Sequence, residues 1–187
     1  WKVIIAGRSE LPFYKKNKNK NLKFFKMNVR FEIDHISLFK EAIKWNKSID
    51  CLVNCAGVSS WRPIKLVDNN FIDMIFETNI KSVIWSCKQA SNFMKSGSSI
   101  INMSSIASKR GSKNNSIYCA SKFAVNGITQ SLSREFGKKN IRVNALCPVN
   151  ILTNGLKSAF KSNFSPTKGN TKKYMKNFID QQSALSK

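Results

Sequence analysis

A tyrosine and a lysine lie four residues apart in the segment SIYCASKFAV, at Tyr118 and Lys122. Positions i and i+4 of a helix lie on one face, so the phenol and the ammonium group are expected to meet. A nearby ammonium group favours the phenolate and lowers the tyrosine pKa from its usual value of about 10. Such a tyrosine could give and take a proton near neutral pH. The alternative is that Tyr118 packs and Lys122 is solvated, and the pair by itself does not decide between the two.

The elements that would position this pair alternate between strands and helices. Short apolar segments bounded by Gly, Pro, Asn or Ser predict strands buried on both faces, at residues 2–9, 22–29, 49–57, 98–105 and 141–148. Segments with helical spacing lie between most of them, at residues 32–45, 69–95 and 116–137. This alternation predicts an α/β fold with a doubly wound parallel sheet.

The whole chain, residues 1–187, is expected to form a single domain. Its length and its 42% content of hydrophobic residues are enough for one core, and no internal repeat or domain boundary is evident. Residues 154–187 differ in character, since they are polar and Gly155, Pro166 and Gly169 interrupt two weak helical patterns. This segment is either a lid over a pocket or a surface excursion, and composition does not separate the two.

Basic residues give the chain a formal net charge of +22. Such a charge can mark a nucleic-acid or membrane partner. Here it is mostly lysine spread along the chain, without a basic face interleaved with aromatics, so we expect no nucleic-acid partner. We also expect no membrane partner, because no apolar run could span a bilayer and no signal peptide is evident. The five scattered cysteines and the single histidine, His35, predict reduced thiols, no metal site and a cytoplasmic location.

Five motifs, in order, resemble those of the classical short-chain dehydrogenases/reductases. NCAG at residues 54–57 is similar to the family's NNAG motif, and TNIKS at residues 78–82 is similar to its NVxG motif. INMSSIAS then precedes YCASK, and CPVNILT at residues 147–153 looks like the family's PGxIxT segment. A lone YxxxK is weak evidence, but five matches at family spacing are specific and cover nearly the whole chain. The resemblance implies a Rossmann-type fold with helices on both faces of the sheet.

The resemblance also implies a catalytic tetrad of Asn79, Ser105, Tyr118 and Lys122. Family spacing selects Ser105 over Ser104, and side-chain alternation along a strand lets only one of the two readily face the site. Tyr118 would be the general acid in carbonyl reduction, and Ser105 would hydrogen-bond the oxygen that becomes negative. Lys122 would lower the pKa of Tyr118 and hold the nicotinamide ribose. Asn79 would fix a water of the proton relay, or would be a helix-distorting residue satisfied by backbone groups.

The cofactor implied by the resemblance is NADP(H) in preference to NAD(H). Arg8 follows the first apolar segment with no carboxylate before it, and a guanidinium suits a 2′-phosphate, although Glu10 keeps the choice open. The remaining implied cofactor contacts are Asn28, Val29, Asn54, Ala56, Gly57, Tyr118, Lys122, Pro148, Val149, Ile151 and Thr153. The substrate pocket would be lined by Trp61, Ala107, Lys109 and the 154–187 segment, which suits a modest substrate of polar or anionic character.

One family feature has no counterpart in the sequence. The TGxxxGxG loop, whose backbone N–H groups cradle the pyrophosphate, is not found in the chain. The first residues, from Trp1, correspond to the family's second strand, and the last ones precede its final strand. We therefore expect an internal fragment of a longer protein, inactive by itself, whose first strand would lie at the sheet centre.

The leading hypothesis is an oxidoreductase that interconverts a carbonyl and a secondary alcohol of a small-molecule substrate. One alternative is a family member that binds nucleotide without turnover, but such a sensor has no need of the proton donor Tyr118. A less favoured alternative is a basic nucleic-acid-binding protein. We also expect self-association, as a dimer or tetramer, through the two long helices, because residues 71–94 are apolar around most of the helix circumference.

Overall fold

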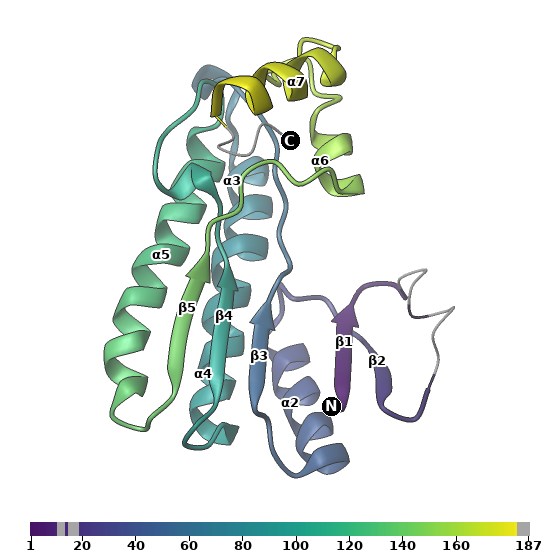
Figure 1. Ribbon diagram of the computed structural model, residues 1–187, viewed down its shortest axis with the longest axis vertical. Coiled ribbons are helices and arrows are strands. Elements are labelled where there is room, and N and C mark those ends of the chain that lie inside the picture. The colour runs from purple at the N-terminus through teal and green to yellow at the C-terminus, as the bar shows by residue number, and fades with distance from the viewer. Residues whose placement is uncertain (11–13, 15–18, 183–187) are drawn as a thin grey trace.

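The computed structural model describes residues 1–10, 14 and 19–182, and its strands all run in one direction (Figure 1). Strand β1 (Val3–Gly7) pairs with β2 (Leu22–Lys26), and β3 (Cys51–Asn54), β4 (Ser99–Met103) and β5 (Arg142–Leu146) form a second parallel sheet in that order. Parallel neighbours require crossover connections, and helices provide them within the β3–β4–β5 sheet. The predicted α/β class with a parallel sheet is confirmed.

Three helices supply the crossovers and pack on the same face of the strands. They are α2 (Glu32–Asn46), α4 (Ser82–Phe93) and α5 (Ser116–Gly137). One continuous core joins them to the sheet, and its members include Phe39 of α2, Ala90 of α4, Ile100 of β4, Val125 of α5 and Val143 of β5. Each of these side chains is at most 6% exposed, so this layer is the principal core of the described chain.

The opposite face of the β3–β4–β5 sheet differs from the expectation that the strands are buried on both sides. Val53 and Leu146 point away from the core and are 52% and 50% exposed. Within the described residues the helices that share the core cover one face, because every crossover between these parallel strands has the same hand. The continuous apolar strand pattern therefore does not show how many faces are covered.

The edges of β1 and β3 face each other without pairing. A groove of about 460 Å³ separates the two sheets and is lined by residues of β1, β3 and α2, among them Val3, Leu52 and Phe39. His35 lies in the first turn of α2 and is only 3% exposed, and its Nε2 is 2.9 Å from the Val29 carbonyl oxygen. The two sheets thus stay apart along this groove.

The helix expected over residues 69–95 is divided into three parts. An α-helix, α3 (Asn69–Phe76), passes into a π-helical turn, η2 (Glu77–Lys81), before α4 begins. Asp68 caps α3 by accepting a hydrogen bond from the Phe71 N–H, 2.8 Å away. The widened turn inserts one extra residue into the helical repeat and so turns Asn79 inward, where it is 1% exposed.

The segment after residue 153 folds over the carboxyl ends of β3, β4 and β5 (Figure 1). It contains α6 (Asn154–Ala159) and α7 (Thr171–Gln182), while residues 183–187 lie outside the described part. Phe160 is 3% exposed and stacks on Trp61 with ring centroids 5.5 Å apart. Tyr174 meets Phe160 edge to face at 5.5 Å, so aromatic contacts attach α7 to the loop that follows β3.

Candidate active site

A cavity of about 610 Å³ opens where β3, β4 and β5 end. The carboxyl ends of parallel strands are the usual ligand position in open α/β sheets. Its walls come from the loop after β3, the short 3₁₀ turn η3 (Ile106–Ser108), the start of α5, the loop after β5, and the cover formed by residues 163–178. Tyr118, Lys122 and Ser105 all line it. The fold therefore brings these three residues of the expected tetrad into one cavity.

Ser105, and not Ser104, contacts the tyrosine. The Ser105 side chain interacts with the Tyr118 side chain and favours its phenolate form, and Ser105 Oγ accepts a hydrogen bond from the Ala107 N–H at 3.1 Å. Ser104 Oγ points the other way and donates to the Lys122 carbonyl at 3.1 Å, in a position only 6% exposed. This divergence follows from the alternation of side chains along an extended backbone.

The pKa of Tyr118 departs from the expectation that Lys122 lowers it. Burial raises the pKa of Tyr118, and the interaction with Ser105 lowers it by less. Lys122 Nζ lies 5.8 Å from the centre of the Tyr118 ring and donates to the Met103 carbonyl oxygen at 2.8 Å. Burial lowers the pKa of Lys122 from 10.5 to about 8. The two shifts have one cause, because a buried site disfavours both phenolate and ammonium.

Asn79 ties the loop after β3 to helix α5. Its Nδ2 donates to the Val58 carbonyl at 2.9 Å and to Ser121 Oγ at 3.1 Å, and its Oδ1 accepts from the Val58 N–H at 2.8 Å. A Cβ atom placed on Gly57 would lie 3.4 Å from Asn79 Oδ1 and 3.6 Å from Lys122 Nζ. A glycine at position 57 thus keeps space open between the amide and the ammonium group. Asn79 thus hydrogen-bonds backbone groups, which was one of its two expected roles.

The other expected cofactor contacts divide into three sets. Those that line the cavity with Tyr118 and Lys122 are Gly57, Pro148, Val149, Ile151 and Thr153. Those that line the groove between the sheets are Val29, Asn54 and Ala56. Arg8 and Asn28 line neither the cavity nor the groove.

Several of these residues have partners within the protein. Asn54 Nδ2 donates to Asn102 Oδ1 at 2.9 Å, across the β3–β4 register. Asn28 Oδ1 accepts from the Arg30 N–H at 3.3 Å, and Thr153 Oγ1 caps α6 by accepting from the Leu156 N–H at 3.2 Å. These side chains therefore also shape the turns in which they lie.

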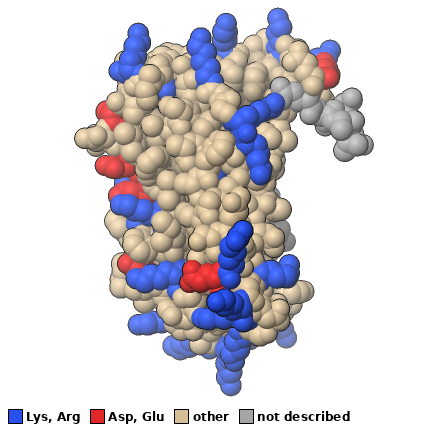
Figure 2. All heavy atoms as spheres, turned by 90° about the vertical axis from the view of Figure 1, so that its left-hand side faces the viewer, with Lys and Arg blue, Asp and Glu red and all other residues tan. Residues whose placement is uncertain are grey.

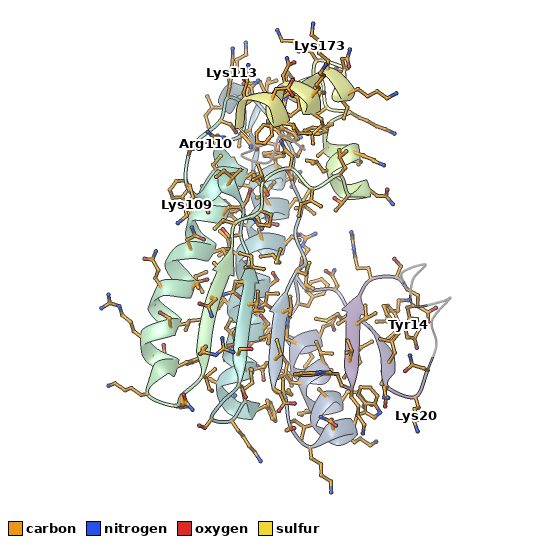
Figure 3. All side chains as sticks on the ribbon, in the orientation of Figure 1. Tyr14, Lys20, Lys109, Arg110, Lys113 and Lys173 are labelled. Carbon is orange, nitrogen blue, oxygen red and sulfur yellow. The ribbon has the colours of Figure 1, made fainter. Side chains whose placement is uncertain are left out.

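The substrate end of the cavity is aromatic and basic. Trp61 and Ala107 line it as expected, whereas Lys109 does not. Figure 3 places Arg110 and Lys113 on the segment between η3 and α5, at the end of the molecule where α7 carries Lys173. Arg110 and Lys113 line the cavity, and no acidic side chain among the described residues does so. This lining suits a neutral or anionic molecule.

Asn115 was not expected from the sequence and also lines the cavity. It is the residue before the first turn of α5, three positions before Tyr118, and is 5% exposed. Its place between two polar residues, in SKNNSIY, gives no pattern that separates it from an ordinary helix-capping residue.

A family model described as short chain dehydrogenase matches residues 1–163. The chain belongs to the short-chain dehydrogenase family. Among curated family relatives, the 3alpha-hydroxysteroid dehydrogenase of Mediterraneibacter gnavus is 41% identical over 103 residues, which are 54% of this chain and 41% of that protein. L-xylulose reductase of Bos taurus is 37% identical over 112 residues, 56% of this chain and 44% of that protein.

Solved structures of the family have the same fold. ElxO, as a tyrosine-to-phenylalanine variant with NADPH bound, matches with a TM-score of 0.77 and 26% identity over 89% of this chain and 70% of that one. A short chain dehydrogenase family protein from Francisella tularensis matches with a TM-score of 0.76 and 27% identity over 84% and 62%. The chain spans less than half the length of the curated relatives named above.

No helix of the described residues combines the length and the apolar character that a membrane span needs. Groups of three or more residues able to ligate a metal are likewise not found in the part of the chain that the structure describes. All five cysteines have free thiols, at Cys51, Cys55, Cys87, Cys119 and Cys147.

Proposed function

We propose that this chain carries the catalytic site of an NADP(H)-dependent oxidoreductase that interconverts a carbonyl and a secondary alcohol. The observation that carries the proposal is the pairing of Ser105 with Tyr118 beside the buried ammonium of Lys122, inside one cavity. Carbonyl reduction needs a hydroxyl that can protonate an oxygen and a second hydroxyl that can hydrogen-bond the same oxygen. It also needs a fixed positive charge nearby.

In the proposed reduction the substrate oxygen lies between the hydroxyls of Ser105 and Tyr118. Ser105 donates a hydrogen bond to this oxygen and stabilises the negative charge that develops there. Tyr118 transfers its proton to the same oxygen, which completes the alcohol, and takes the proton back in the reverse direction. Lys122 supports transfer from Tyr118 because a positive charge nearby offsets the phenolate that remains.

A nicotinamide cofactor fits one part of this site. When bound, it supplies or accepts the hydride at the carbonyl carbon. Tyr118, Lys122, Gly57, Pro148, Val149, Ile151 and Thr153 line the cavity and would hold its nicotinamide half. Gly57 favours this assignment, since the space that a Cβ would fill borders Lys122. The TGxxxGxG loop that would cradle the pyrophosphate is not among residues 1–187.

The preference for NADP(H) over NAD(H) is supported by Arg8, which directly follows β1 and is exposed. A guanidinium at a strand terminus can pair with a 2′-phosphate in two-point geometry. The NADPH-bound ElxO structure supports the same cofactor. Val29, Asn54 and Ala56 would contact the adenosine half from the groove side, and Asn28 would contact it from the loop after β2. Asn79 would hold a water of the proton relay.

The substrate proposed is a small molecule. The printed names of relatives include dehydrogenases and reductases for steroids, sugars and sugar alcohols, so the class of carbonyl compound differs within the family. The proposal also includes self-association as a dimer or tetramer and a cytoplasmic location. It includes no nucleic-acid partner and no membrane partner. The free thiols support a reducing compartment.

A nucleotide-binding family member without turnover is the second candidate. Lys122 and Gly57 could hold a nucleotide without chemistry, but the pairing of Ser105 with Tyr118 favours the enzyme, since a sensor needs no paired hydroxyls in its cavity.

The test is carbonyl-dependent NADPH oxidation by the full-length protein and two matched serine variants. Ser105→Ala should lower kcat by about tenfold or more, because it removes a hydrogen bond to the developing charge. Ser104→Ala makes the same change at the neighbouring position, on the far side of the backbone, and should have a smaller effect. A larger loss in Ser104→Ala would contradict the assignment, and turnover of no carbonyl compound would favour the nucleotide-binding alternative.

A further inference from the structure

The segments that wall the Tyr118 cavity contain basic residues and no acidic ones. These segments are residues 55–63, 103–122 and 147–179. All ten Asp and Glu residues of the chain lie outside these ranges. Besides the buried Lys122, three cationic side chains line the cavity: Arg110, Lys113 and Lys168. We call these three the cationic rim, and no carboxylate of the cavity wall offsets their charge.

The cationic rim comes from two segments that are held together. Arg110 and Lys113 lie between η3 and α5 (Figure 3), and Lys168 lies in the cover between α6 and α7. Asn114 joins the two segments, because its Nδ2 donates to the Phe164 carbonyl oxygen at 3.4 Å. All three cationic residues are exposed, so a molecule that enters the cavity can reach them.

The two lysines of the rim have no structural task within the described chain. Neither Lys113 nor Lys168 forms an ion pair or a side-chain hydrogen bond there, whereas Arg62, on the loop after β3, pairs with Asp68 at 2.9 Å. Lys168 also has a left-handed backbone, with φ 45°, a conformation that glycine adopts with less strain. The turn therefore does not require a lysine at this position.

The same cavity offers apolar contacts close to the reacting tyrosine. Its apolar and aromatic lining includes Ile106, Leu156, Phe164, Tyr174 and Phe178. Ser112 Oγ lies 4.0 Å from the sulfur of Cys119, the residue after Tyr118. Lys113 follows Ser112 directly, so its Cα is about 3.8 Å from that of Ser112. One small molecule can therefore contact Tyr118, the apolar lining and the cationic rim together.

We propose that the cationic rim binds a carboxylate or phosphate group of the substrate, which is then a ketone with an apolar chain and an anionic end group. A cleft lined by charge of one sign raises the local concentration of ligands of the opposite sign. Guanidinium and ammonium groups are the usual donors to carboxylate and phosphate oxygens. This inference rests on the proposed carbonyl site.

The experiment compares three ketones with the same chain and different end groups: 5-oxohexanoate, 5-oxohexyl phosphate and the neutral 5-oxohexanamide. Their dissociation constants are measured on the full-length protein by ligand-observed NMR. NADPH is present throughout, so that the anions do not occupy the sites of the cofactor phosphates. At least one anionic ketone should bind about tenfold or more tightly than the amide, the scale of one charge-assisted hydrogen bond. The tighter of the two identifies the end group.

The double variant Lys113→Gln/Lys168→Gln should lower that preference to about threefold or less, because it removes two charges of the rim. Arg110 is left unchanged, since it also interacts within the protein. The matched control is Lys40→Gln/Lys138→Gln, which removes the same charge from exposed positions outside the cavity wall. The control should keep the wild-type preference, which separates the rim from the net charge of +22.

Three results would overturn the inference. They are equal binding of all three ketones by the wild type, a preference that the rim variant leaves unchanged, and an equal loss in the rim variant and the control. If the rim variant fails to fold by circular dichroism, the single variants Lys113→Gln and Lys168→Gln take its place, and at least one should lower the preference. Binding is measured independently of turnover, so a preference for an anionic ketone without NADPH oxidation would count against the proposed function alone.

Discussion

At the scale of single residues, the environment of Lys122 sets the electrostatics of the site. Its side chain is 5% exposed, and its ammonium group bonds the Met103 carbonyl with no carboxylate partner among the described residues. Burial without a counter-charge disfavours the protonated form, which is why the pKa of Lys122 falls to about 8. A buried charge without a carboxylate partner can interact with an anionic group of a ligand.

This cost predicts a pH dependence of stability. Since the folded-state pKa of Lys122 is about 8, below the 10.5 of the unfolded chain, protonated Lys122 destabilises the fold fully below pH 8. The penalty is relieved as the pH rises from 8 towards 10.5. From pH 7 to pH 10 the wild-type free energy of unfolding should rise relative to that of Lys122→Met by about 2–3 kcal/mol. Urea denaturation of both proteins at the two pH values measures this, and parallel pH profiles would contradict it.

Motif spacing predicted that Ser105, Tyr118 and Lys122 lie together, and the structure places all three in one cavity, because short-range order fixes which side chains leave a strand end and share a helix face. The prediction that the pKa of Tyr118 is lowered was wrong. Burial raises this pKa, and burial depends on loops that close over the ring and lie far away in the sequence. Asn115 was missed for a similar reason. Its place in the cavity wall exists only once the cavity has formed.

At the scale of elements, the π-helical turn η2 holds the loop after β3 against α5. Asn79 satisfies both backbone groups of Val58 and also bonds Ser121, so one amide joins three segments. Nothing in the apolar period of residues 69–95 signals this turn. Apolar residues already occupy most of the helix circumference there, so a shift in phase by one residue leaves no visible break in the pattern. The parallel strands were predictable, whereas the unpaired edges of β1 and β3 are a tertiary feature.

Asn79→Ala should lower the free energy of unfolding by about 2–4 kcal/mol, because two backbone groups of Val58 lose their partner in a buried position. The control is Asn92→Ala, the same change at an exposed position of α4. That variant should stay within about 0.5 kcal/mol of the wild type, as surface substitutions usually do. Chemical denaturation gives both values, and equal effects would remove the structural role of Asn79.

At the scale of the whole molecule, the outer face of α5 suits self-association. Lys and Arg gather towards the two ends of the face that Figure 2 presents, and its middle is largely uncharged. The exposed residues of α5 include Ala120, Phe123 and Gly127, and Phe123 is 49% exposed. An uncharged helix face with an exposed aromatic ring is a reasonable contact between two copies.

Gly127→Arg should convert the proposed oligomer to a monomer. The position has open space around it, so the change adds a long charged side chain to the α5 face without a clash inside the chain. Light scattering on the full-length protein at micromolar concentration should show a mass of two or four chains for the wild type and one for the variant. Lys138→Arg, at an exposed position beyond the end of α5, should leave the mass unchanged. A monomeric wild type would contradict the proposal.

The central claim is that Tyr118 is the proton donor of a carbonyl reductase, and its most direct test is turnover by Tyr118→Phe. The change removes one hydroxyl and keeps the ring that packs beside Lys122. In the full-length protein, kcat for NADPH-dependent reduction should fall by about a hundredfold or more, the range expected for loss of a general acid, while NADPH affinity stays within a few-fold of the wild type. Near-normal kcat in this variant would contradict the account.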